Sequence, residues 1–189
     1  MRKLAKAFLV TLIAYLLQVC VVPYMKIAGI TPNLLLANIA VFTVSYGKKY
    51  AFGTAAMTGM LLETMSVNVN VLILVIYPLY GLLCAQIFAD MSDRKREQRR
   101  LRNKTQADRN AYFRIFANAL VLTALFESTM LLFTSLTGIA VTFTHIIRSV
   151  RCLLYTAFVT LVVMIPTRWT LGMYRRRAPA LYRKEGVRL

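Results

Sequence analysis

Long apolar stretches alternate with short segments that hold most of the positive charge of this chain. A helix that crosses a bilayer needs roughly 17–25 mostly apolar residues, and several stretches approach or reach that length. Hydrophobic residues make up 58% of the 189 residues, whereas a typical soluble domain is about 45–50% apolar. A small soluble fold cannot cover such an excess. The pattern therefore predicts an integral membrane protein and not a soluble enzyme.

We predict an all-α fold, a single membrane domain over residues 1–189 built as a bundle of about six transmembrane helices. Two of the expected helices are short for a bilayer, so they either extend into the interface or lie tilted and shielded by protein. Five helices, or one re-entrant segment, are the alternatives. Residues 138–150 are expected to form a loop or an interfacial turn. The expected helices cover 7–25, 33–46, 51–65, 67–89, 111–136 and 151–173.

The distribution of Lys and Arg predicts the orientation. If the N-terminus lies in the cytoplasm, all of the 24 Lys and Arg except Lys26, Arg148 and Arg151 fall on the cytoplasmic side. Cytoplasmic loops of membrane proteins carry such an excess. We therefore expect a multi-pass protein of the cell membrane with both termini in the cytoplasm, including a basic tail over 174–189.

The net charge of +17 would also suit nucleic-acid binding. Most of it, however, lies in the segment 92–110 and the tail, and 92–110 has no aromatic residue that could stack on bases. We expect this loop to contact anionic lipid headgroups, with a docking site for a partner protein as the alternative. No nucleic-acid partner is expected.

Two acidic residues lie within or beside the expected helices. Glu127 is near the middle of 111–136, where a charge costs at least ~2.5–3.5 kcal/mol. It is either a substrate or proton site or a carboxyl that holds two helices together. Glu63 ends the segment 51–65, where water or a partner could reach it. The two acids could also form a carboxylate pair.

Motifs that carry chemistry are lacking in the sequence. His145 is the single histidine, and Cys20, Cys84 and Cys152 are isolated in apolar stretches, as small buried hydrophobic residues would be. Neither a GxSxG nor an HExxH motif occurs, and no phosphate-binding glycine loop does. We therefore expect no cofactor, no metal site, no catalytic residue and no enzymatic activity.

Small and polar residues within the apolar stretches suggest close helix contacts. Gly53, Ala56 and Gly59 recur at a spacing of three, and Ala55 and Gly59 form a small-xxx-small pair. Small residues let helix backbones approach closely in membranes, so these helices pack either within the chain or against a helix of a partner. Polar amides could join helices or line a ligand cavity in the same regions; they are Asn33, Asn38, Asn68, Asn70, Gln86 and Asn118.

One series of short motifs covers about a third of the chain. Pro32 and Asn33 open a helix before three leucines, and Gly47 begins a Gly-Lys-Lys-Tyr turn. The next helix runs from Gly53 to the Gly-Met-Leu-Leu-Glu sequence over 59–63. Tyr77, Tyr80 and Gly81 follow in the next helix.

This order resembles the MreD family of bacterial rod shape-determining membrane proteins. The family has a Pro-Asp/Asn-Leu-Leu start, a Gly after a short loop and a Gly-Leu-Leu-Leu-Asp-like helix end. This chain departs from that pattern with Glu63 in place of the usual Asp, and with Ser-Val-Asn-Val-Asn over 66–70 in place of a glycine-containing segment.

The resemblance implies a non-catalytic component of the cell-elongation machinery. Such a protein binds the single-span protein MreC and helps to couple the cytoskeletal protein MreB to peptidoglycan synthesis. The residues that it implies for partner binding or structure are Pro32, Asn33, Gly53, Gly59, Glu63, Tyr77 and Gly81.

The family fold is also similar to the substrate-binding subunits of energy-coupling-factor vitamin transporters. A transporter subunit of that kind is the alternative function, and Glu127 with the asparagines would then form its ligand site.

Overall fold

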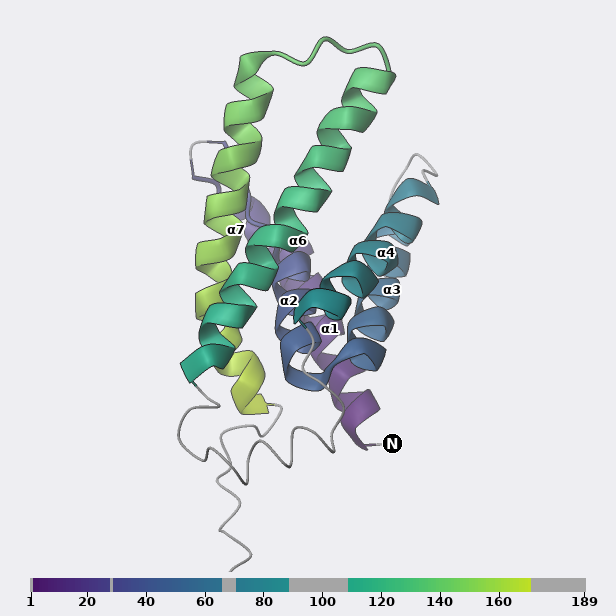
Figure 1. Ribbon diagram of the computed structural model, residues 1–189, viewed down its shortest axis with the longest axis vertical. Helices are drawn as coiled ribbons and strands as arrows, with labels where there is room; N and C mark the ends of the chain where they lie inside the picture. Colours follow the sequence, from purple (N-terminus) through teal and green to yellow (C-terminus); the bar gives the residue numbers. More distant parts are fainter. Residues whose placement is uncertain (1, 28, 66–70, 89–108, 171–189) are drawn as a thin grey trace, which may run out of the picture.

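The computed structural model describes residues 2–27, 29–65, 71–88 and 109–170 (Figure 1). The predicted tail 174–189, residues 92–108 of the predicted loop 92–110, and Asn68 and Asn70 lie outside these ranges. The described residues are helical apart from short connections, which confirms the all-α prediction for them. The helices are α1 (Arg2–Cys20), the short 3-10 helix η1 (Val22–Tyr24), α2 (Leu34–Tyr46), α3 (Lys48–Met65), α4 (Val71–Phe88), α6 (Arg109–Leu136) and α7 (Phe143–Thr170).

Among the described residues, three helical segments are long and apolar enough to cross a membrane: Ala5–Tyr24, Tyr112–Leu136 and Phe143–Thr170. Leu34–Tyr46 and Leu72–Phe88 are apolar but shorter. The architecture is therefore compatible with a helical membrane bundle. Six membrane crossings stay a prediction.

The short helix α2 lies at the centre of the bundle. It contacts α1, α3, α4, α6 and α7, and its residues from Leu34 to Ser45 are all buried. Thirteen residues extend only ~20 Å at 1.5 Å per residue, less than the ~30 Å hydrocarbon core of a bilayer. Of the two explanations offered for its shortness, shielding by protein is the one that the structure supports.

Both ends of α2 are determined by local sequence. The side chain of Asn33 accepts hydrogen bonds from the first backbone N–H groups of the helix, which makes Asn33 the N-cap and places Pro32 one residue outside it. At the other end Gly47 adopts a positive φ of 83°, and its N–H donates to Thr43 O over 3.1 Å. Glycine has no Cβ that would clash in this conformation, so the chain can turn directly into α3.

Four of the other helices form two hairpins beside α2. The helices α3 and α4 pack along each other, as do α6 and α7. In Figure 1 the α6–α7 turn extends well beyond the α3–α4 hairpin at the same end of the bundle. The chain runs up and down in alternation, so the N-terminus, the α2–α3 turn and the end of α7 lie at the opposite end.

The last helix begins much earlier than the sequence pattern suggested. The predicted span starts at 151, but α7 starts at Phe143, so most of the expected loop 138–150 is helical. His145 accepts a hydrogen bond at Nδ1 from the backbone N–H of Thr142 over 3.2 Å, which helps to satisfy the helix N-terminus. Polar residues such as Arg148 therefore belong to the first turns of α7 and not to a loop.

Candidate functional site

The residues that precede α2 join four helices at one point. The side chain of Asn33 accepts hydrogen bonds at Oδ1 from Leu35 N (3.2 Å) and Leu36 N (3.1 Å). Its Nδ2 donates to the hydroxyl of Tyr77 on α4 over 3.1 Å. Its backbone N–H donates to Thr156 Oγ1 on α7 over 3.0 Å. Asn33 therefore ties α2 to both α4 and α7.

Gln18 on α1 completes this contact. Its Nε2 donates to Pro32 O over 3.3 Å, and its Oε1 accepts from Leu34 N over 2.7 Å. The residues Gln18, Pro32, Asn33, Tyr77 and Thr156 are called the Asn33 junction below. Two predicted site residues, Asn33 and Tyr77, meet here directly. Gln18 and Thr156 were not predicted, because nothing in their local sequence indicates which helix they contact.

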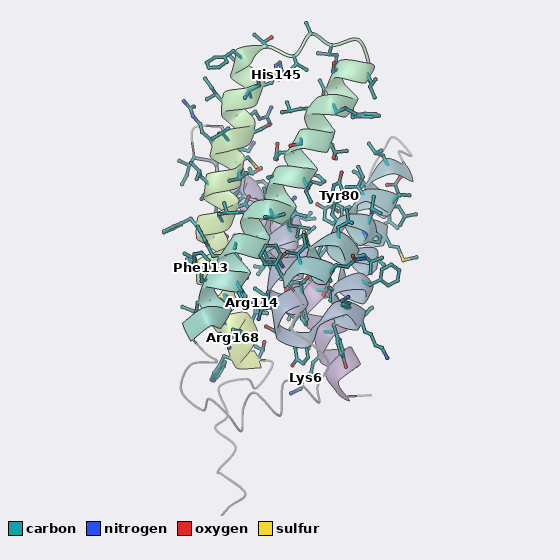
Figure 2. All side chains as sticks on the ribbon, viewed as in Figure 1. Lys6, Tyr80, Phe113, Arg114, His145 and Arg168 are labelled. Atoms are coloured by element: carbon teal, nitrogen blue, oxygen red, sulfur yellow. The ribbon has the colours of Figure 1, made fainter. Side chains whose placement is uncertain are left out.

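Aromatic packing holds Tyr77 in place. Its side chain is only 2% exposed, and its ring meets Phe126 of α6 edge-on with 5.3 Å between centroids. One turn further along α4, the hydroxyl of Tyr80 hydrogen-bonds to Thr129 of α6. Figure 2 shows Tyr80 between these helices. The two tyrosines thus connect the α3–α4 hairpin to α6.

Gly59 and Gly81 lie where α3 and α4 leave no room for larger side chains. A Cβ on Gly81 would lie 2.7 Å from Ala55 Cβ and 3.4 Å from Ala51 O. A Cβ on Gly59 would lie 3.3 Å from the Cα of Leu74. Both positions therefore serve packing within the chain, as small residues do between membrane helices.

Gly53 differs from the other two glycines. A Cβ there would meet nothing within 4 Å, and the residue is exposed. Nearby on the same helix Phe52 is 46% exposed and Met60 is 61% exposed. The sequence left two roles open for these small residues, contacts within the chain or with a helix of a partner. At Gly53 the described part of the chain makes no such close contact, and its side of α3 faces outward.

Glu63 is not the water-exposed carboxylate that its place at a helix end suggested. Both of its carboxylate oxygens are buried, and neither makes a hydrogen bond within the described part of the chain. Leaving such a group without a partner is costly. Glu63 is not part of the Asn33 junction. It also lines neither of the two cavities near that junction, which are described below.

A polar cavity of about 300 Å³ opens beside the Asn33 junction. Glu127 of α6 lines it together with His145 and Arg148 of α7. The cavity therefore brings an acid and two basic side chains to one space. Its other lining residues are Gln18, Ile30, Thr31, Pro32, Asn33, Met130, Leu131, Thr134, Ser149 and Cys152.

The early start of α7 explains why the sequence pattern did not predict Arg148 as a neighbour of Glu127. The pattern predicts a loop or interfacial turn over 138–150, and Arg148 lies in it. It therefore gives Glu127 no basic neighbour in another predicted span. Since α7 already begins at Phe143, its first turns run beside the end of α6 and carry Arg148 to the cavity that Glu127 lines.

The opposite end of the bundle carries a second group of basic residues. Figure 2 shows Lys6, Arg114 and Arg168 toward that end, and His145 at the other. Arg114 donates to Phe88 O, and the Arg168 guanidinium lies 5.0 Å from the centroid of the Tyr112 ring. Arg168 is only 5% exposed, so this cation–π contact forms in a desolvated setting, where it is strongest.

The chain was compared with protein families, with curated proteins and with solved structures. No family model, no curated protein and no solved structure matches this chain. The resemblance to the MreD family thus stays a prediction from short motifs.

Within the described ranges no group of three or more His, Cys, Asp or Glu side chains could hold a metal ion. Asn38, which the sequence offered as helix glue or cavity lining, donates to Thr11 Oγ1 of α1 over 3.3 Å, and Asn118 donates to Ala40 O of α2 over 3.2 Å. Both therefore join helices, whereas Asn33 is the one predicted amide among the described residues that also borders the cavity.

Proposed function

We propose that this chain is a non-catalytic, multi-pass protein of the bacterial cell membrane that acts in the cell-elongation machinery, as MreD proteins do. Its six helices cross the membrane with both termini in the cytoplasm. It binds an MreC-like partner and helps to couple the cytoskeleton to peptidoglycan synthesis.

The observation that carries this proposal is the unit formed by the segment that resembles the family. Asn33, Gly59, Tyr77 and Gly81 are four of the seven residues that the resemblance implies, and each makes a close contact that holds α2, α3, α4 or α7 together. Residues that support a rigid membrane unit in this way suit a scaffold, whose task is to hold a binding surface in one shape.

The outward side of α3 supports a contact with another protein. Gly53 leaves a place where a second helix could approach the backbone closely, and Phe52 and Met60 could pack beside it. Helix association in lipid depends on such close packing. We therefore assign Gly53 to the partner interface and the other two glycines to the fold.

Charge placement supports the proposed orientation. Among the described residues Lys6, Lys48, Lys49, Arg114 and Arg168 belong to one end of the bundle, which is also the end where the N-terminus lies (Figure 1). An excess of Lys and Arg is typical of the cytoplasmic side.

Depletion and complementation in the bacterium that carries the gene test this function. Loss of the protein is expected to turn rod-shaped cells round, because lateral wall growth loses its membrane scaffold. The wild-type gene and the matched control Val162→Leu, on an exposed position of α7, are expected to restore rods, whereas Gly53→Leu is not. Unchanged cell shape after depletion would contradict the proposal.

The cavity beside Glu127 favours a second candidate, a substrate-binding subunit of a vitamin transporter. About 300 Å³ is at the lower limit of typical ligand pockets, which run from ~300 to ~1,000 Å³. Such a subunit would be found with a membrane coupling protein and two ATPases, so its partners distinguish it from the scaffold.

A further inference from the structure

A second cavity adjoins the polar one at the same end of the bundle. It has a volume of about 410 Å³ and lies between the segment before α2 and the start of α7, where it is lined by Gly29, Ile30, Thr144, Ile147, Arg148 and Arg151. Ile30 and Arg148 line both cavities. The two spaces are therefore neighbours that share one arginine.

Positive charge at this end is rare and concentrated. Lys26, Arg148 and Arg151 are the only Lys or Arg that the chain order assigns to this end, and two of the three line the same cavity. Arg148 and Arg151 are three residues apart on a helix and therefore neighbours on one side of it. Guanidinium groups bind phosphate oxygens through paired hydrogen bonds.

An apolar stripe continues from this arginine pair along α7. Leu154, Phe158 and Ile165 are exposed by 60%, 65% and 59%. They lie 3, 7 and 14 residues after Arg151, so the 3.6-residue period places them on its side of the helix. An anion-binding pair at the head of an exposed apolar stripe is complementary to an amphiphile with a charged head.

We propose that this end of α7 binds one anionic phospholipid with a hydroxylated headgroup, such as phosphatidylglycerol. Arg148 and Arg151 hold the phosphodiester in the larger cavity. The acyl chains lie along Leu154, Phe158 and Ile165. The headgroup hydroxyls reach the polar cavity and donate to the Glu127 carboxylate, which is an acceptor when ionised. This site does not depend on the proposed scaffold function.

Lipid binding to the purified full-length protein in detergent tests the site, with native mass spectrometry to count bound lipids. Phosphatidylglycerol is expected to bind more tightly than phosphatidylcholine. The double variant Arg148→Gln/Arg151→Gln is expected to weaken phosphatidylglycerol binding by about thirtyfold, since each basic residue near an anionic lipid surface contributes on the order of fivefold.

Three further variants keep the outcome interpretable. Lys26→Gln removes a positive charge at the same end that lines neither cavity, and it is expected to change binding by less than about threefold. Arg148→Lys/Arg151→Lys keeps both charges but loses paired hydrogen bonds, so an intermediate loss is expected. Glu127→Gln is expected to reduce the preference for phosphatidylglycerol over phosphatidic acid, whose headgroup has no glycerol hydroxyls.

Three results would overturn the proposal. If the double-Gln variant and Lys26→Gln lost phosphatidylglycerol binding equally, the lipid would be held by general electrostatic attraction and not by a site at Arg148 and Arg151. If phosphatidylcholine bound as tightly as phosphatidylglycerol, the two arginines would not select anionic lipids. Binding of glycerol phosphate as tight as that of the lipid would mean a site for soluble anions and not for a membrane lipid.

Discussion

At the scale of single residues, Asn33 determines more of this structure than any other predicted site residue. It caps α2, binds Tyr77 and binds Thr156. The capping role could be predicted, because Asn after Pro and before an apolar run is a typical helix start. Its contacts with α4 and α7 could not, because they depend on helices that are distant in sequence.

Removing the Asn33 side chain should therefore destabilise the bundle through two effects. Asn33→Ala is expected to cost about 1 kcal/mol for the lost cap and about 0.6 kcal/mol for the lost bond to Tyr77, a typical value between membrane helices. Unfolding in mixed micelles with increasing dodecyl sulfate measures the total.

A double-mutant cycle separates the two effects. Tyr77→Phe removes the hydroxyl alone and is expected to cost about 0.6 kcal/mol, and the double variant should cost less than the sum of the single variants by about that amount. Strict additivity would show that the bond between Asn33 and Tyr77 contributes nothing to stability.

At the scale of elements, the hydrophobic pattern located the helices better than their ends. The sequence between 138 and 150 is more polar than the predicted spans, with Thr142, Thr144, His145 and Arg148 close together. Thr144, His145 and Arg148 nevertheless lie in the first turns of α7, and Thr142 directly precedes it, because the α6–α7 hairpin extends past the other helices. Apolar content predicts the part of a helix that faces lipid or core, and it does not indicate where the hydrogen-bonded backbone begins.

The three glycines of the α3–α4 hairpin should respond differently to alanine. Gly81→Ala is expected to destabilise by about 1–3 kcal/mol, because its Cβ would lie 2.7 Å from Ala55 Cβ. Gly59→Ala should cost less, since its nearest contact is 3.3 Å. Gly53→Ala should stabilise by up to about 1 kcal/mol, because the site is open and alanine favours helix.

The same unfolding assay ranks the three variants, and Ala55→Gly in the Gly81→Ala background is expected to restore part of the loss by making room for the new methyl group. An equal response at all three positions would contradict the close approach of α3 and α4 at Gly81.

At the scale of the whole molecule, the short buried helix α2 lies at the centre of the bundle. The two ends of the bundle differ in how many Lys and Arg residues they carry. The sequence pattern predicted the charge asymmetry, because it depends only on which segments carry Lys and Arg. It did not predict the central place of α2 or the cavity between α1, α6 and α7, since both arise from how helices pack. Only Pro32, Asn33 and Glu127 among the predicted site residues line that cavity.

The central claim is that the folded unit around α2 presents a surface to an elongation partner. The most direct test is affinity purification of the tagged protein from its own cells in mild detergent, with mass spectrometry of what is bound. We expect a single-span coiled-coil protein together with wall synthases, and we expect Gly53→Leu to lose them while Gly53→Ala retains them. Recovery of a membrane coupling protein with two ATPases would contradict the claim and identify a transporter subunit instead.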